Sequence, residues 1–469
     1  MAQRLPVGEG KMETPDGPWS WCVLAASMVT YAVTLGFPSA IGIFYTDLQN
    51  SFNATNQETS WFPSIITAVL HAGGPLCSIM VERFGCRITV MVGGLLCGIG
   101  LVASSFSQNI IHLYLSAGIV GGLGLSLSFQ ASVTVLGYYF IKRRTLANAL
   151  AATGASIGMA LWPLISQYLL ETMGWRGSFM IFGGIFLNCC VCGAVMRPVK
   201  APPAAPGKDA SSSMQNGTSG GVTELEQRKG IQRYMAFDLL LRHRRYQIYT
   251  IGVTWMVLGF VLPLFYLVPY ATSNGIEEKT GALLLSLIGF VNIFARPVAG
   301  IVSQHKRFSG KRIYLFSGAV VLNGLSNLVC AASASFSALV VYCGLYGVSM
   351  SVIGALVFNV LMEIVGMKRF PGAFGLFTIL ESVTLLIGPP LAGFLVDLTG
   401  KYSFVFYFTC IAVSSSGIFM LIASYIVDRK EAQSNQKPVN ISDGKANDCH
   451  KNVIYRPAKQ ENCTQTNLV

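Results

Sequence analysis

Charged side chains are scarce in this sequence. Aspartate, glutamate, lysine and arginine make up 12% of its 469 residues, whereas 52% are hydrophobic. A soluble domain carries about 25% charged residues, so the composition excludes an ordinary soluble globular protein. Long apolar runs without charge instead indicate a polytopic membrane protein, because one span needs about 20 residues of apolar helix.

Motifs for catalysis, nucleotide hydrolysis and ion filtering are also missing. The sequence has no glycine-rich phosphate-binding loop, no catalytic constellation and no filter sequence of the potassium-channel kind. We therefore expect neither an enzyme nor an ATP-driven pump, and no cofactor. Most of the twelve cysteines lie inside apolar runs, where cysteine usually packs as a small hydrophobe. The cysteines at 189–192 have no histidine or acidic companions, so we expect no metal site.

Apolar runs between charged or turn-rich breaks predict an all-α membrane protein with twelve spans. The predicted spans lie near residues 19–45, 61–81, 88–107, 111–138, 146–170, 177–196, 248–270, 281–303, 313–333, 337–361, 373–396 and 403–427. They divide the chain into an N-terminal six-helix half at 19–196 and a C-terminal half at 248–427.

Three polar segments flank these halves. The N-terminal segment covers 1–18, and a linker rich in proline, alanine, serine and glycine covers 197–247. The linker ends in the basic stretch AFDLLLRHRRY, which is either an amphipathic helix on the anionic inner leaflet or an ordinary loop next to the membrane. Residues 428–469 form a polar tail that we expect to be disordered.

Lysine and arginine are distributed unevenly between the two sets of loops. Loops after the even-numbered spans hold twenty of them, against three in the opposite loops. The positive-inside rule therefore predicts that the even-numbered loops and both termini are cytosolic. Most of the net charge of +12 is thus a topological signal and does not indicate a nucleic-acid partner. Contact with membrane lipid follows from the spans themselves.

The two halves resemble each other in sequence. The stretch GGPLCSIMVERFGCRITV between spans 2 and 3 resembles ARPVAGIVSQHKRFSGKRIY between spans 8 and 9, and WPLISQYLLETMGWRGSF resembles PPLAGFLVDLTGKYSF six spans later. Two parallel six-helix halves joined by a cytosolic loop are the plan of the major facilitator superfamily. The residues ERFGCR match its acidic–Arg–x–Gly–x–Arg signature, which predicts a cytosolic gating motif that includes Glu82, Arg83 and Arg87. We expect Arg143 and Arg144, in the loop after span 4, to add further gating charges.

Two longer stretches resemble the signatures of the monocarboxylate transporter family. They are PDGPWSWCV at 15–23 and YYFIKRRTLANALAATG at 138–154. The first keeps the family residues Asp16, Gly17, Trp19 and Trp21 but has Pro18 and Ser20 in place of two glycines. The resemblance extends over about residues 15–427. It implies a plasma-membrane carrier of small carboxylates, with a proton in many members and with a single-span chaperone subunit in some.

The resemblance also implies where the substrate binds. In the well-understood lactate carriers of the family, a span 1 lysine, a span 8 aspartate, a span 8 arginine and a span 10 phenylalanine form the site. These positions correspond to Ser39, Asn292, Arg296 and Met350. Only the arginine is kept, so the site retains an anion-binding group and lacks the usual titratable aspartate.

The residues themselves support the same assignment. Arginine in a bilayer costs about 2.5 kcal/mol or more, and its guanidinium can hold a carboxylate by two parallel hydrogen bonds. The alternative for Arg296 is a structural ion pair. Glu381 in span 11 is either its partner or a proton carrier, because a buried carboxyl group can take up and release a proton. His71 in span 2 is either a second titratable group or a hydrogen-bonded packing residue.

We therefore expect a secondary transporter of monocarboxylates or related organic anions that works by alternating access. We expect transport to be proton-linked or pH-sensitive, as in many members of the family, and uncoupled facilitated diffusion of bulkier amphipathic anions is the alternative. The adaptable side chain of Met350 favours a wider pocket. A membrane scaffold or sensor without transport is the hypothesis from another class.

Overall fold

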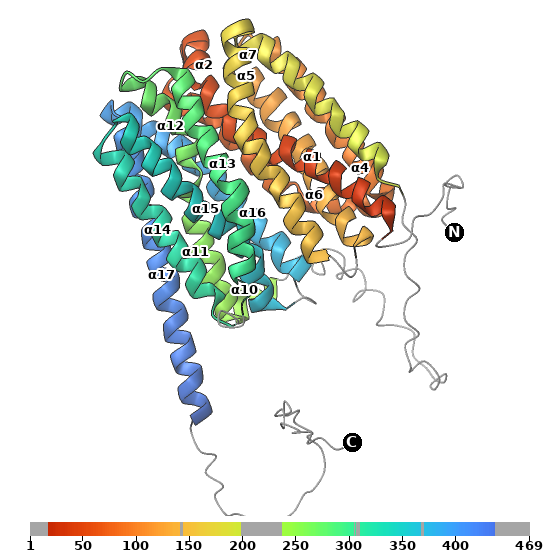
Figure 1. Cartoon of the computed structure of the whole chain (residues 1–469), viewed down its shortest axis with the longest axis vertical. Helices are drawn as coiled ribbons and strands as arrows, with labels where there is room; N and C mark the ends of the chain where they lie inside the picture. The colour runs from red at the N-terminus through yellow and green to blue at the C-terminus, as the bar shows by residue number, and fades with distance from the viewer. Residues whose placement is uncertain are drawn as a thin grey trace, which may run out of the picture. The chain divides into compact units, whose positions relative to one another are not determined.

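The computed structural model describes residues 17–140, 144–197, 237–303, 305, 310–366 and 370–436. Helices and short connections make up this described part, which contains no strand. Ten of its helical stretches are long and apolar enough to cross a membrane. The described chain is therefore an all-α membrane protein, as the composition predicts (Figure 1).

The first half holds spans 1 to 6. Its elements are α1 (Pro18–Ala40), η1 (Ile41–Phe44), α2 (Tyr45–Phe52), α3 (Asn56–Ala72), α4 (Gly74–Ser105), α5 (Ile110–Leu113), the π-helix η2 (Tyr114–Gly121), α6 (Gly122–Tyr139) and α7 (Arg144–Val195). The second half holds spans 7 to 12. Its elements are α10 (Phe237–Arg242), α11 (Arg244–Phe260), α12 (Leu262–Ser273), α13 (Glu278–Ser303), α14 (Arg312–Ala332), α15 (Phe336–Val365), α16 (Phe370–Thr399) and α17 (Ser403–Gln436).

Two long helices each contain a sharp break at a glycine. Gly85 in α4 has φ 81° and ψ 163°, and Gly174 in α7 has φ 68° and ψ 176°. Only glycine adopts such a backbone conformation at low cost. Each break reverses the chain between two spans: span 2 from span 3 in α4, and span 5 from span 6 in α7. Counting these arms separately accounts for the twelve predicted spans.

The same backbone device recurs in the second half. Gly310, between spans 8 and 9, has φ 76°, and Gly400, between spans 11 and 12, has φ 67°. These positions correspond to Gly85 and Gly174 in the sequence repeat. The repeat is therefore visible in backbone geometry as well as in residue similarity.

Small residues let helices within the first half approach closely. A Cβ atom on Gly158 of α7 would lie 2.1 Å from the carbonyl oxygen of Ala32 in α1, and one on Gly154 would lie 2.3 Å from that of Met28. Contact at this distance is available only to glycine, as expected for small-xxx-small packing between membrane helices.

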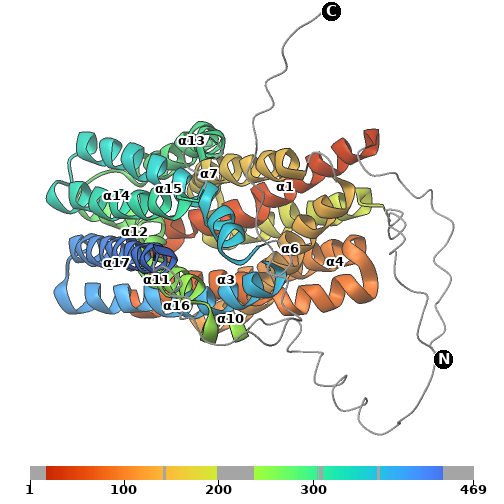
Figure 2. The same cartoon turned by 90° about the horizontal axis from the view of Figure 1, so that it is seen from below.

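The two halves meet along two helix pairs. Helix α3 packs on α16, and α7 packs on α13. A Cβ atom on Gly289 of α13 would lie 2.4 Å from the backbone nitrogen of Ala160 in α7, so the second pair is also in backbone contact. Figure 2 shows the red-to-yellow helices of residues 18–195 beside the green-to-blue helices of residues 237–427.

The linker and the C-terminal tail, which we expected to lie outside the membrane spans, are both partly helical. The helix α17 continues to Gln436, past the predicted end of span 12 at 427, so residues 428–436 correct the expectation of a disordered tail. The end of the linker forms α10, whose Leu239 is buried in a cluster with Tyr246 and Tyr249. At least one apolar side chain of this stretch therefore packs against protein. Residues 1–16, 198–236 and 437–469 lie outside the described residues.

Candidate functional site

Asn292 lies on the buried face of α13 and bonds to two helices. Its Nδ2 donates to the carbonyl oxygen of Ile288, 2.9 Å away, within the same helix. The hydroxyl of Ser351 in α15 donates to its Oδ1 at 2.8 Å. Met350 Sδ lies 3.9 Å from the same amide. The side chain is fully buried, so these contacts fix the amide between spans 8 and 10.

Arg296 follows Asn292 by one helical turn, on the same side of α13. Its Nε atom is buried and has no hydrogen-bond partner, while the residue as a whole is half-buried. Within the described part of the chain, no carboxylate lies within 4.0 Å of its guanidinium. The expected alternative of a structural ion pair therefore finds no partner among the described residues. A guanidinium in this setting has free donors for an anion.

The guanidinium lies against a glycine of the neighbouring helix. A Cβ atom on Gly354 of α15 would lie 2.8 Å from Arg296 Nη2, 3.2 Å from Cζ and 3.3 Å from Nε. Gly354 follows Met350 by one turn. Arg296, Asn292 and Met350 thus lie at one contact between α13 and α15.

Ser39 and His71 bond to their own helices. The hydroxyl of Ser39, which follows Pro38 in α1, donates to the carbonyl oxygen of Gly36 at 2.6 Å and is buried. The Nδ1 of His71 lies 2.8 Å from the carbonyl oxygen of Thr67, one turn earlier in α3. Neither contact reaches the α13–α15 site. The bond of His71 is the one expected of a packing histidine.

Glu381 lies in α16 and is half-buried. It forms no ion pair with Arg296 within 4.0 Å. Of the two roles expected for Glu381, pairing with Arg296 is the one that this arrangement does not provide.

The predicted cytosolic motif surrounds the break at Gly85. Glu82, Arg83 and Arg87 are all exposed on α4. Arg143 lies outside the described residues, and only the backbone of Arg144, at the start of α7, is described. The structure therefore places the motif's acidic and basic groups at the turn between spans 2 and 3.

The signature residues of span 1 tie its first turn to other spans. Gly17 is the N-cap of α1, and Asp16 lies outside the described residues. Trp19 Nε1 donates to the carbonyl oxygen of Val195 at 3.1 Å, and the Arg197 guanidinium lies 3.9 Å from its ring centre. The Trp21 ring packs edge-on against Phe140, with 5.7 Å between centres. These tryptophans hold the ends of spans 4 and 6 and are remote from Arg296 in the chain.

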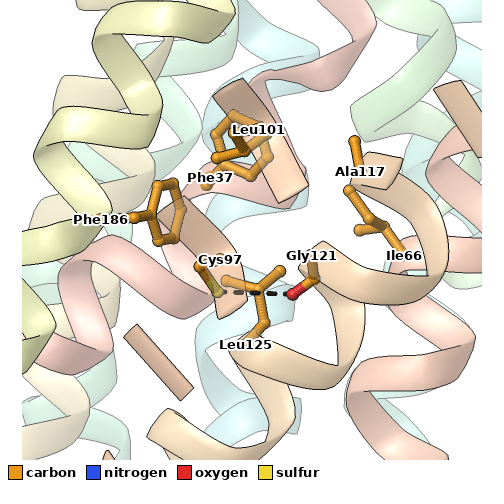
Figure 3. A pocket seen from close by; sticks show the side chains of 8 residues that line it. All are labelled: Phe37, Ile66, Cys97, Leu101, Ala117, Gly121, Leu125 and Phe186. Carbon is orange, nitrogen blue, oxygen red and sulfur yellow. Dashed lines mark hydrogen bonds between the residues drawn. The ribbon is translucent and has the colours of Figure 1, made fainter. Parts of the chain in front are cut away.

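A small apolar pocket lies inside the first half and shares no lining residue with this site (Figure 3). Uncharged residues line it: Phe37, Ile66, Cys97, Leu101, Ala117, Gly121, Leu125 and Phe186. It has no room for a water molecule, so a solvated carboxylate does not fit. We treat it as a packing defect next to the π-helix.

Sequence reasoning did not identify Ser351 and Gly354. Both act through contacts between spans 8 and 10, which depend on how each helix is rotated about its axis. A single serine or glycine in an apolar run carries no signal of such a contact.

Comparison of the sequence with known proteins identifies the family to which the chain is similar. The model of the Major Facilitator Superfamily matches residues 22–322 and 250–447. Monocarboxylate transporter 6 of Homo sapiens is 55% identical over 420 residues, covering 90% of this chain and 83% of the relative. The mouse protein of that name is 50% identical over 437 residues, covering 90% and 91%. Monocarboxylate transporter 2 of Mesocricetus auratus is 39% identical over 424 residues, covering 90% and 87%.

Solved structures share the fold. The inward-facing, unoccupied crystal structure of a bacterial homologue of the human lysosomal transporter Spinster superposes with a TM-score of 0.66 at 14% identity, covering 88% of this chain and 98% of that chain. Its occupied form gives 0.61 at 12% identity, covering 90% and 100%.

Proposed function

The chain belongs to the monocarboxylate transporter family of the major facilitator superfamily, and we propose that it carries monocarboxylates or related small organic anions across the plasma membrane by alternating access. Members of this family are transporters and not enzymes. In this proposal Arg296 anchors the substrate carboxylate, and Asn292, Met350 and Ser39 shape the cavity around it. Both termini and the even-numbered loops face the cytosol.

The unpaired guanidinium of Arg296 carries this proposal. A charge within a membrane span is costly and usually marks a substrate or ion pathway. Here no described carboxylate neutralises it, and Gly354 leaves space for it between α13 and α15. A substrate carboxylate supplies the missing negative charge and accepts two parallel N–H···O bonds.

If transport is proton-linked, as in many members of the family, we propose that Glu381 carries the proton. This carboxyl group lies within span 11 and forms no ion pair with Arg296. The alternative is uncoupled facilitated diffusion of bulkier anions. Asn292 favours that alternative, because an amide at the usual aspartate position binds through hydrogen bonds and does not titrate.

Uptake of labelled carboxylates by oocytes or proteoliposomes tests the anchor. Arg296→Ala removes the charge, and Arg296→Lys keeps the charge but loses the two-pronged geometry. Saturable uptake should be lost in the first and weakened in the second. Lys401→Ala removes one exposed positive charge outside the spans and serves as the matched control. Unchanged saturable uptake by Arg296→Ala, with normal surface abundance, would contradict the proposal.

Separately imposed pH and voltage gradients distinguish the two modes of transport. A proton-linked carrier accumulates substrate when an inward proton gradient is imposed at zero voltage, and Glu381→Gln abolishes this accumulation. An uncoupled carrier responds instead to voltage, by about 2.3 kcal/mol per 100 mV for one charge.

Co-expression with a single-span chaperone subunit tests whether surface delivery needs that partner. A chain that reaches the surface and transports nothing would support the scaffold hypothesis.

A further inference from the structure

The two halves are joined at one end of the bundle by an acidic side chain and a helix N-terminus. Asp397 lies near the end of α16, in the second half, and Asn56 begins α3, in the first. Asp397 Oδ1 accepts from the backbone nitrogen of Asn56 at 3.0 Å and from its Nδ2 at 2.8 Å. Asp397 Oδ2 accepts from the backbone nitrogen of Gln57 at 2.9 Å.

These are amides that an α-helix cannot satisfy by itself. The first N–H groups of a helix have no partner in the preceding turn, and a carboxylate there also interacts favourably with the helix dipole. Within its own half, α3 already has a cap at another position. Thr55 Oγ1 accepts from the backbone nitrogen of Glu58, and Glu58 Oε2 accepts from that of Thr55 at 2.9 Å. Asp397 therefore adds bonds that only the opposite half can supply.

Further polar contacts surround the same junction. The hydroxyl of Tyr402 donates to Asn56 Oδ1 at 2.9 Å, and burial together with the nearby Asp397 raises the pKa of Tyr402 to about 12. Its hydroxyl therefore stays a donor at physiological pH. Ser60 Oγ lies 2.5 Å from the Tyr266 hydroxyl, which in turn donates to the carbonyl oxygen of Pro389 at 2.9 Å.

A glycine allows the backbones to meet here. A Cβ atom on Gly393 of α16 would lie 2.6 Å from the carbonyl oxygen of Asn56 and 2.7 Å from Ser60 Oγ. The approach is closer than any other residue permits without displacing α3. The carboxylate bonds and the glycine contact both require the two halves to touch at this end.

We infer that Asp397 is an interhalf latch, which holds the predicted extracellular gate closed by capping α3 of the opposite half. The inference rests on the proposed alternating-access cycle, in which the halves must separate at this end to admit substrate from outside. Separation exposes the amides of Asn56 and Gln57 to water and breaks three bonds to one carboxylate. The latch thereby sets how often the outward-open state forms.

Accessibility of a buried position beneath the latch tests this inference. Ser64 is fully buried in α3, one turn below Ser60. In a Ser64→Cys chain on intact cells, an external charged thiol reagent reaches the cysteine only when the gate opens. The chain without Ser64→Cys gives the background from native cysteines, and labelling is normalised to surface abundance.

Adding Asp397→Ala should speed labelling at least tenfold, because it removes three hydrogen bonds to a charged group and the loss of one such bond already shifts an equilibrium by about tenfold. Because Asp397 is exposed, each of these hydrogen bonds is taken at the lower end of the free-energy range for bonds to charged groups. Asp397→Asn keeps one acceptor oxygen and should give a smaller increase. Gly393→Ala pushes the backbones apart with Asp397 intact and should also speed labelling.

Glu58→Gln is the matched control, since Glu58 caps the same helix without reaching the other half. Its labelling rate should stay near that of the Ser64→Cys parent. Equal acceleration by Glu58→Gln and Asp397→Ala would show that fraying of α3 is responsible and would overturn the latch, as would no acceleration by Asp397→Ala. Labelling needs no substrate, so failure of the proposed transport activity leaves this result interpretable.

Discussion

Replacing Gly354 with alanine perturbs the proposed anion site while every charged group stays in place. The new Cβ atom would lie 2.8 Å from Arg296 Nη2, whereas ordinary van der Waals contact begins at 3.4 Å. The guanidinium must therefore move by about 0.6 Å, which exceeds the ~0.5 Å within which a binding constellation has to be held.

A shift of this size misaligns one of the two hydrogen bonds that the guanidinium can donate to a carboxylate. Loss of one bond to a charged group costs about 1.5 kcal/mol, and about 1.4 kcal/mol corresponds to a tenfold change in affinity. We expect the KM for the carboxylate to rise about tenfold. Folding should not suffer, because alanine is favoured over glycine inside a helix by about 1 kcal/mol.

Initial rates of labelled uptake over a range of substrate concentrations measure this KM. Gly344→Ala is the control, because Gly344 lies on the same helix and a Cβ atom there meets nothing within 4 Å. An unchanged KM in Gly354→Ala, with the variant at normal abundance, would refute the view that Arg296 binds substrate from its position over Gly354.

Three further predictions concern the anion site and two packing contacts in the first half. Asn292→Asp places a carboxyl group beside Arg296 that competes with the substrate when it is ionised and does not when it is protonated. The KM of this variant for the carboxylate should therefore fall as pH falls. Uptake at a series of pH values, equal inside and outside, measures this KM. Gly158→Ala forces a Cβ atom to 2.1 Å from the Ala32 carbonyl oxygen and should destabilise the protein by about 3 kcal/mol, seen as a lower Tm in detergent. Gly184→Ala, with nothing within 4 Å, should leave the Tm unchanged or higher. Trp19→Phe loses the bond to the end of span 6 and should lower the Tm modestly without changing KM.

Hydropathy was sufficient to locate the spans because the bilayer imposes the length of each apolar run. The sequences around Gly85 and Gly310 also repeat visibly, but the repeat alone did not show that the backbone breaks at these glycines. The boundaries were less certain. Nothing in residues 428–436 marks the end of α17, because a polar helix can continue into water once its first turns are formed.

The site was predictable only where residues follow one another along a single helix. Asn292 and Arg296 share a face of α13, which their spacing shows directly. Their partners on α15 depend on tertiary packing, and sequence left open whether Glu381 pairs with Arg296. The contact between Asp397 and Asn56 joins residues 341 apart in the chain, beyond the reach of any local pattern.

The π-helix of span 4 bears on how the two halves are compared. A π turn holds one more residue than an α turn, so side chains after Gly121 are rotated by about 100° relative to an uninterrupted α-helix. Its counterpart in the second half, α15, is α-helical from Phe336 to Val365. Spans 4 and 10 therefore differ by one residue of phase, and an alignment that equates them needs a gap within 114–121. Without that gap, every pseudo-symmetry partner assigned to Met350 or Gly354 falls on the wrong face of span 4.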